Sequence, residues 1–170
     1  AYIDKDCRLF GGQSAHVEAM LASGADTSLI SVVGFPGFAP LKESICHGLK
    51  TCVANKESIV CGGAAIRALL EQHNARLYPV DSEHSAIFQC LEGNRDKEIR
   101  RILLTCSGGP FRTWEKGEIA KATVEQAIKH PKWNMGTKIS IDSATLANKG
   151  LEVLEARWLF DVPVEQVEVV

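Results

Sequence analysis

The 170-residue sequence has no long apolar run and almost no excess of charge of one sign. A bilayer-spanning helix needs about 20 apolar residues, and no stretch approaches that length, so we expect no membrane contact. The 19 basic and 21 acidic residues leave a formal net charge of −2, which gives no general attraction to nucleic acid.

Cysteine pairs at metal-binding or redox spacing are also missing, since no two cysteines are separated by only two residues. The cysteines lie mostly in apolar runs, which predicts buried thiols in a reducing compartment rather than a disulfide framework. They are Cys7, Cys46, Cys52, Cys61, Cys90 and Cys106.

The glycine-rich loop that holds the phosphates of dinucleotides, Gly-x-Gly-x-x-Gly, does not occur in the chain. The first residue is Ala rather than Met, and the last residues, 167–170, resemble a strand. We therefore expect a fragment of a longer protein. Its apolar content of 45% is enough to build a core.

Apolar strand-like runs alternate with helical segments in the first half of the chain. We expect helices at 13–23, 39–49 and 58–73 and strands at 28–33, 51–54 and 76–80. This alternation predicts an α/β fold, a parallel sheet covered on both faces, with ligands at the carboxyl ends of its strands.

The second half has a different, mixed pattern that predicts an α+β part, with a boundary near residue 80. We expect helices at 84–91 and 143–160, a helical stretch within 115–128, and strands at 100–105, 137–141 and 167–170.

Two carboxylates follow the strand expected at 76–80. In an extended segment Asp81 and Glu83 would point to the same side. Like charges that point together repel unless a cation lies between them, and hard oxygen ligands suit a divalent metal. Ser82 and His84 add a hydroxyl and an imidazole. The alternative is an ordinary solvated acidic loop.

A second candidate lies on the helix expected from residue 143. Thr145, Asn148 and Glu152 recur at three- and four-residue spacing on one face. Asn148, Lys149 and Glu152 can therefore present an amide, an ammonium and a carboxylate toward one site. Asp142 and Ser143 are good N-cap residues, and a helix N-terminus near a hydroxyl and a lysine favours phosphate. Glu152 would then supply the third oxygen ligand for a metal. The alternative is an amphipathic helix whose Glu152 is solvated.

Four further residues have open interpretations. Ser107 opens a Gly-Gly-Pro turn that could wrap an anion or could be only a tight turn. Lys56 could polarise a carbonyl or lie on the surface. His130 could be an acid/base group or a loop residue. Trp133 could belong to a lid over substrate or anchor its loop to the core.

Five of these segments, taken in order, resemble the 1-deoxy-D-xylulose 5-phosphate reductoisomerase family. They are ANKES at 54–58, VDSEH at 80–84, SGGPFR at 107–112, HPKWNMG at 130–136 and DSATLANKGLE at 142–152. The resemblance implies the C-terminal part of a Rossmann-like NADPH-binding domain in 1–80, followed by a truncated α+β catalytic domain in 81–170. The family's Gly-rich loop and C-terminal helical domain would lie outside these 170 residues.

The resemblance also implies roles for single residues. It implies Mg²⁺, Mn²⁺ or Co²⁺ bound by Asp81, Glu83 and Glu152, with Lys56, Glu83 and His130 acting in catalysis. It implies a nicotinamide cofactor near Asn55, Glu57 and Gly136. The substrate-binding residues that it implies are Lys56, Ser82, Glu83, Ser107, His130, Trp133, Ser143, Asn148, Lys149 and Glu152.

The activity implied by the resemblance is an NADPH-dependent rearrangement and reduction of 1-deoxy-D-xylulose 5-phosphate. The product would be 2-C-methyl-D-erythritol 4-phosphate, in the non-mevalonate isoprenoid pathway. The family is homodimeric. We expect a bacterial cytoplasmic enzyme, with the plastid as the alternative location, and we expect the 170 residues alone to be inactive.

Two other functions remain open from the residues. One is a metal-dependent phosphosugar lyase or hydrolase that uses Asp81, Glu83, His84 and His130 without a nicotinamide. The other is a chain that binds ligand without catalysis.

Overall fold

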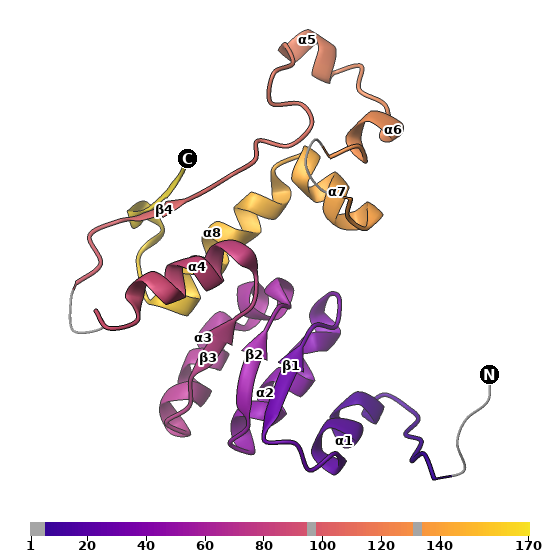
Figure 1. Ribbon diagram of the computed structural model, residues 1–170, viewed down its shortest axis with the longest axis vertical. Coiled ribbons are helices and arrows are strands. Elements are labelled where there is room, and N and C mark those ends of the chain that lie inside the picture. The colour runs from indigo at the N-terminus through magenta and orange to yellow at the C-terminus, as the bar shows by residue number, and fades with distance from the viewer. Residues whose placement is uncertain (1–5, 95–97, 131–133) are drawn as a thin grey trace. The chain divides into compact units, whose positions relative to one another are not determined.

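The computed structural model describes residues 6–94, 98–130 and 134–170 (Figure 1). The chain forms two compact units, Ala1–Phe88 and Gln89–Val170. Helices and parallel strands make up both units, which confirms the expected α/β class. Within the described ranges no helix combines the length and apolar character needed to cross a bilayer.

The first unit is built around a three-stranded parallel sheet in the order β1-β2-β3. In its register, Leu29 pairs with Cys52 and Cys52 with Tyr78. The elements of this unit are α1 (Ala15–Ala22), β1 (Thr27–Ile30), the 3-10 helix η1 (Phe35–Gly37), α2 (Phe38–Cys46), β2 (Lys50–Val53), α3 (Lys56–Gln72), β3 (Leu77–Pro79) and α4 (Ser82–Leu91), which ends beyond the unit boundary.

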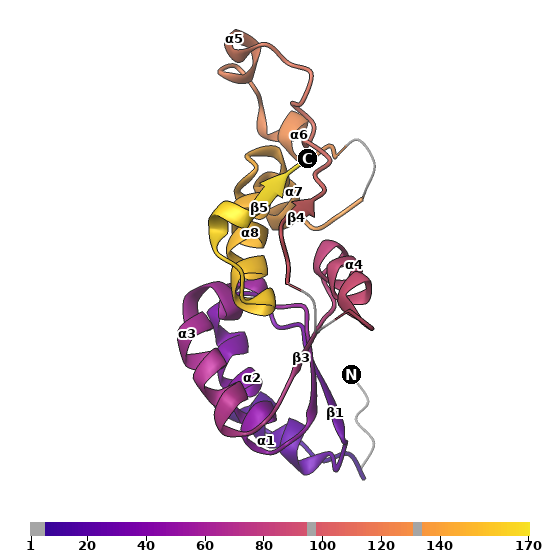
Figure 2. The same cartoon turned by 90° about the vertical axis from the view of Figure 1, so that its left-hand side faces the viewer.

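Helices α2 and α3 lie on one side of this sheet (Figure 2). Leu41 and Ile45 of α2, Val53 of β2 and Ile59 of α3 are all at most 1% exposed. Burying one such side chain stabilises the fold by about 1.5–3 kcal/mol, so these four residues form the core that holds the sheet in place.

The opposite face of the sheet is covered only in part, which corrects the expectation of two covered faces. Phe88 of α4 packs against Tyr78, with ring centroids 5.7 Å apart. Leu29, which shares this face, remains 60% exposed. Side chains of β1 alternate between the two faces of the sheet. Ser28 and Ile30 point toward the helices and are buried, whereas Leu29 points to the partly covered face.

Asn55 fixes the connection between β2 and α3. Its side-chain oxygen accepts the backbone N–H of Ser58 at 2.8 Å, which makes Asn55 the N-cap of α3. Its amide nitrogen donates to the carbonyl oxygens of Val32 and Gly34, at 2.5 and 2.8 Å. One buried side chain therefore joins the start of α3 to the loop that follows β1.

We predict that Asn55→Ala lowers the free energy of unfolding by about 2 kcal/mol, because a cap and two buried hydrogen bonds are lost. Chemical denaturation measures the change. Asn55→Asp separates the two contributions, since it keeps the cap acceptor and removes the donors. We expect Asn55→Asp to remain destabilised, and wild-type stability in that variant would show that the contacts to the β1 loop contribute nothing.

The second unit contains a two-stranded parallel sheet, β4-β5, and two helices that pack together, α7 and α8. Leu104 of β4 and Ala156 of α8 are both fully buried in its core. The elements are β4 (Ile102–Leu104), α5 (Lys116–Ile119), α6 (Val124–Ala127), α7 (Thr137–Ala144), α8 (Ala147–Phe160), the 3-10 helix η2 (Val164–Gln166) and β5 (Val167–Val169).

The strand predicted at 137–141 is wrong, because these residues form helix α7. The alternating β-branched residues of this segment imitate a strand, but contacts four residues apart stabilise a helix. Lys138 pairs with Asp142 at 2.8 Å. Ser140 donates its hydroxyl to the carbonyl of Gly136 at 3.0 Å and is only 1% exposed.

The helix predicted at 143–160 begins later than expected. Helix α7 ends at Ala144, Leu146 adopts a left-handed backbone with φ of 61°, and α8 starts at Ala147. Asp142 and Ser143 therefore lie in the last turn of α7 and do not cap α8, so the predicted phosphate site at a capped N-terminus is wrong in that detail. The left-handed Leu146 separates the two helices.

The helical stretch predicted within 115–128 is two short helices, α5 and α6, each opened by a capping box. In α6 the box joins Thr123 and Gln126. The pKa of the Glu125 carboxyl is lowered. The main cause is a backbone N–H that donates to the carboxylate, and the second is a hydrogen bond from the Thr123 side chain. Local capping thus defines both helices, neither of which has a buried residue.

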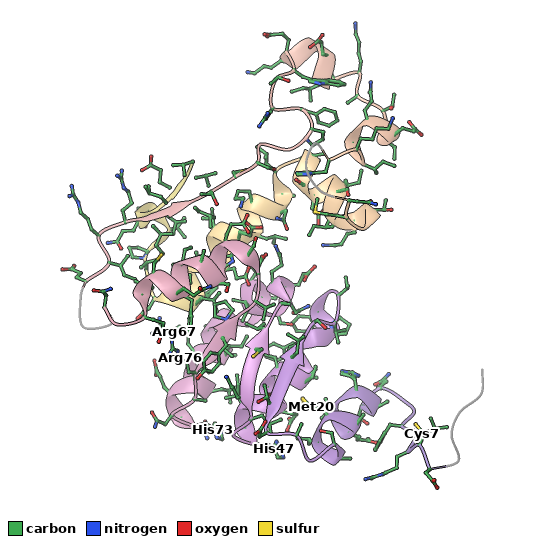
Figure 3. The ribbon with its side chains drawn as sticks, in the orientation of Figure 1. Cys7, Met20, His47, Arg67, His73 and Arg76 are labelled. Carbon is green, nitrogen blue, oxygen red and sulfur yellow. The ribbon has the colours of Figure 1, made fainter. Side chains whose placement is uncertain are left out.

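The prediction of buried cysteines is wrong. All six are free thiols and none is fully buried. Cys7, labelled in Figure 3, is exposed, as are Cys61 and Cys90. Their apolar sequence neighbours fill the core instead: Ile59 of α3 is 1% exposed, whereas Cys61 on the same helix faces outward.

Candidate functional site

Asp81 and Glu83 do not share the face of a strand, which corrects the geometry expected for them. Strand β3 ends at Pro79 and helix α4 begins at Ser82. The carbonyl of Asp81 accepts the N–H of Ser85 at 2.8 Å, the first helical bond, and Glu83 lies in the first turn. A helix N-terminus stabilises negative charge, so both carboxylates have a favourable backbone position.

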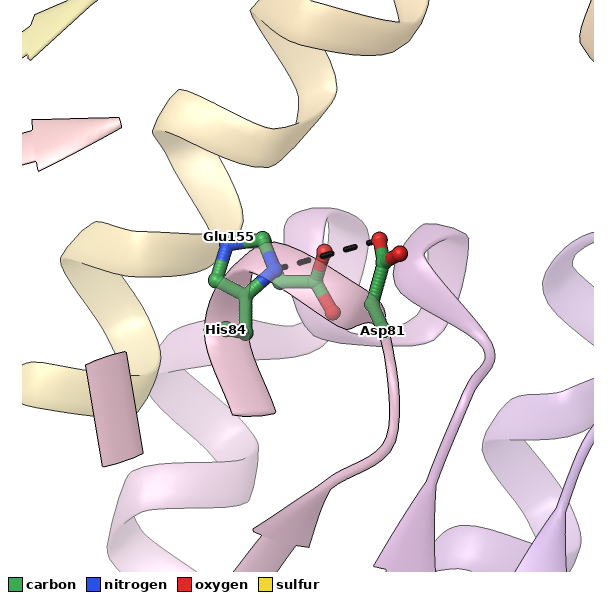
Figure 4. A group of neighbouring side chains, drawn as sticks. All are labelled: Asp81, His84 and Glu155. Atoms are coloured by element: carbon green, nitrogen blue, oxygen red, sulfur yellow. Dashed lines mark ion pairs between the residues drawn. The ribbon is translucent and has the colours of Figure 1, made fainter. Parts of the chain in front are cut away.

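The Asp81 carboxylate is surrounded by cationic and polar groups of the first unit. The ammonium of Lys56, the first residue of α3, lies 2.8 Å from Oδ2. The backbone N–H of Ser82 donates to Oδ1 at 3.0 Å. Nδ1 of His84, a fully buried residue, lies 3.8 Å from Oδ2 (Figure 4). Asp81 is thus held beside a lysine that is only 9% exposed.

The hydroxyl of Ser82 donates a hydrogen bond to Oε2 of Glu83. Glu83 is half-buried and Ser82 is exposed. The neighbouring hydroxyl therefore fixes the direction in which the Glu83 carboxylate points.

Glu152 is the most enclosed carboxylate among the predicted site residues, with 2% exposure. The amide of Asn148 donates to its Oε1 at 2.5 Å, and the ammonium of Lys149 donates to its Oε2. Lys149 also donates to the backbone carbonyl of Thr105, at 2.7 Å. One turn of α8 thus brings together an amide, an ammonium and a carboxylate.

The loop after β4 lies against two other predicted site residues of its unit. Ser107 Oγ and His130 Nε2 share a hydrogen bond of 3.1 Å. A Cβ atom added to Gly109 would lie 2.7 Å from the carbonyl oxygen of Ser143. Ser107 and Ser143 therefore belong to segments in direct contact, although 36 positions separate them along the chain.

The remaining predicted residues lie at helix starts or outside the described ranges. Asn55 is the N-cap of α3, and Glu57 lies in its first turn. Gly136 is the N-cap of α7. Trp133 falls in 131–133 and lies outside the described residues.

Sequence reasoning missed one group that the structure brings to the Lys149 side chain, the carbonyl oxygen of Thr105. A backbone acceptor leaves no signal in residue type. The one indication in the sequence is that Thr105 lies two positions before the Gly-rich turn at 107–110.

Comparison with known proteins gives two family-model matches. Residues 2–63 match the 1-deoxy-D-xylulose 5-phosphate reductoisomerase model, and residues 77–160 match the C-terminal domain model of the same enzyme. Proteins of that name from Lachnospira eligens and Chloroherpeton thalassium are 48% and 49% identical, over 98% and 95% of this chain. The chain covers 44% and 42% of the lengths of those relatives.

Solved structures agree in fold. A DOX-P reductoisomerase in complex with NADPH, fosmidomycin and magnesium superposes with a TM-score of 0.84 at 36% identity. The Zymomonas mobilis 1-deoxy-D-xylulose 5-phosphate reductoisomerase in complex with NADPH gives 0.82 at 45% identity. Each alignment covers 93% of this chain, and 41% and 40% of those chains. Sequence and fold agree, and the chain belongs to the 1-deoxy-D-xylulose 5-phosphate reductoisomerase family.

Proposed function

We propose that the complete protein carrying these residues converts 1-deoxy-D-xylulose 5-phosphate to 2-C-methyl-D-erythritol 4-phosphate, with NADPH and a divalent metal, in isoprenoid biosynthesis. The observation that carries the proposal is the family match, since 2–63 and 77–160 contain every predicted site residue. Three solved relatives are complexes with NADPH, with magnesium or with both.

We propose Asp81, Glu83 and Glu152 as the metal ligands. All three offer hard carboxylate oxygens, which Mg²⁺ and Mn²⁺ prefer. Oδ2 of Asp81 is buried and lies 2.8 Å from the Lys56 ammonium. Glu152 is buried beside the Lys149 ammonium. Three carboxylates suit a hard divalent cation, which would compete for oxygens that the Lys56 and Lys149 ammonium groups now hold.

Ser107, Ser143, Asn148 and Lys149 are the proposed grip on the substrate phosphate. Hydroxyl, amide and ammonium groups all donate to phosphate oxygens. Two contacts within the second unit support this proposal. The Ser107 loop lies against Ser143 of α7, and Lys149 of α8 donates to the carbonyl of Thr105, just before that loop. Binding the phosphate away from the reacting carbons orients the rest of the substrate, which accounts for part of the rate.

Asn55, Glu57 and Gly136 are the residues proposed to lie near the nicotinamide. Asn55 fits this role by shaping the loop at the carboxyl end of β1, where parallel sheets collect ligands. Gly37 allows this close approach, because a Cβ there would lie 2.7 Å from the Asn55 side chain.

The proposed reaction uses side chains of this protein together with a bound metal and NADPH. The metal supplies Lewis-acid polarisation of the substrate oxygens when bound, and NADPH supplies hydride. Glu83, oriented by Ser82, is proposed to take and return the proton of a substrate hydroxyl at its carboxylate. Lys56 is proposed to donate to the carbonyl region of the substrate, and His130 to contact the substrate.

The test is NADPH oxidation by the complete protein, followed as the loss of nicotinamide absorbance. We expect oxidation that requires both 1-deoxy-D-xylulose 5-phosphate and Mg²⁺ or Mn²⁺, with 2-C-methyl-D-erythritol 4-phosphate as the product. Metal-dependent consumption of the phosphosugar without NADPH oxidation would instead indicate a lyase or hydrolase.

A further inference from the structure

Both oxygens of Glu152 are engaged by the side chains that are proposed to bind phosphate. Asn148 occupies Oε1 and Lys149 occupies Oε2. The three residues lie within one turn and a half of α8, and Lys149 and Glu152 are 8% and 2% exposed. A phosphate and a metal that used these groups would therefore draw on the same three side chains.

Each ligand would compete with these bonds. A carboxylate oxygen that a lysine holds gives less of its charge to a metal ion, because the two cations compete for one site. A lysine held by a buried carboxylate likewise gives less to a phosphate. A phosphate that binds Lys149 and a metal that binds Glu152 would therefore each weaken the same ion pair.

We propose that the Lys149–Glu152 pair couples phosphate binding to metal binding, with Asn148 as a second link. This inference rests on the proposed function, since it assumes the phosphate and metal roles of these residues. Phosphate draws Lys149 and Asn148 away from Glu152 and leaves the carboxylate available to the metal. The metal in turn releases the two donors, so each ligand strengthens the binding of the other.

The first experiment measures inorganic phosphate binding by calorimetry in the complete protein, with EDTA present and no metal. We expect Glu152→Gln to raise the phosphate affinity by roughly fivefold or more, because Lys149 no longer faces a buried charge. Asp142→Asn is the matched control: it removes a carboxylate next to Ser143 that pairs with Lys138. We expect it to change the affinity less than twofold.

The second experiment measures Mn²⁺ binding with no phosphate present. We expect Lys149→Gln to bind Mn²⁺ roughly fivefold more tightly than wild type, because Oε2 of Glu152 is released. Lys138→Gln is the control, since Lys138 pairs with Asp142 instead, and we expect it to match the wild type. Each experiment uses a single ligand, so complexes between Mn²⁺ and phosphate in solution cannot imitate the effect.

The coupling is overturned if Glu152→Gln leaves phosphate affinity unchanged, or if Asp142→Asn raises it equally, since general charge would then explain the gain. Unchanged or weaker Mn²⁺ binding by Lys149→Gln also overturns it. A third result would test the phosphate assignment itself. If the wild type, Glu152→Gln and Asp142→Asn all bind no phosphate, that assignment fails, and the coupling fails with it.

Discussion

Replacing Glu152 by Gln is expected to lower kcat/KM of the complete protein by at least about a hundredfold and to weaken Mn²⁺ binding by a similar factor. Groups that only orient metal ligands are typically worth 10–100-fold, so the loss of a direct carboxylate ligand should cost no less. The substitution keeps the shape of the side chain and removes its charge. Calorimetric Mn²⁺ titration and steady-state NADPH oxidation measure the two effects.

The fold must be shown to survive this substitution, because removing one partner of a buried ion pair is destabilising. Gln keeps one acceptor oxygen, so it can replace one of the two bonds that Asn148 and Lys149 now make to Glu152 but not the other. We therefore expect the thermal unfolding midpoint to fall while the protein remains folded. Glu168→Gln, at an exposed residue of β5 that pairs with Arg101, should keep wild-type activity and metal affinity. Unchanged Mn²⁺ affinity in a folded Glu152→Gln protein would refute the three-carboxylate assignment.

Sequence periodicity predicted the secondary structure correctly in segments where either the helical or the strand period dominated. The βα alternation of the first unit, from β1 to α4, was predicted in the right order, with ends displaced by a few residues. The spacing of Asn148, Lys149 and Glu152 on one helical face was also predicted correctly, because contacts three and four residues apart follow from helix geometry alone.

Periodicity failed where contacts along a helix outweighed the intrinsic preferences of its residues. The alternation of Ile139 and Ile141 with polar residues favoured a strand, yet the Lys138–Asp142 pair and the hydroxyl of Ser140 stabilise α7. The left-handed Leu146 that separates α7 from α8 was not predictable, since non-glycine residues rarely adopt that conformation.

The environment of Asp81 shows what spacing could not supply. Two carboxylates two positions apart were interpreted as neighbours on a strand, but the chain enters α4 at Ser82. The group that faces Asp81 is Lys56, which lies 25 positions earlier in the chain. Parallel topology made this meeting foreseeable in outline, because the carboxyl ends of β2 and β3 lie at one edge of the sheet.

Gly109→Ala should be the most damaging substitution in the Ser107 loop. Gly109 is buried and has φ of 67°, a left-handed backbone that costs an L-residue about 1–2 kcal/mol. A Cβ there would also lie 2.7 Å from the backbone oxygen of Ser143, and overpacking adds about 1–3 kcal/mol. We expect the free energy of unfolding to fall by about 3 kcal/mol, measured by chemical denaturation.

Gly117→Ala is the matched control. Gly117 lies in α5 of the same unit, a Cβ added there would have no other atom within 4 Å, and its backbone is not left-handed. Alanine is favoured over glycine in a helix by about 0.5–1 kcal/mol, so this variant should be as stable as the wild type or more so.

The Ser107 loop also carries a proposed phosphate ligand, and moving it away from α7 separates Ser107 from Ser143. Gly109→Ala should therefore weaken inorganic phosphate binding as well as stability, whereas wild-type phosphate affinity in a folded Gly109→Ala protein would remove this loop from the proposed phosphate site.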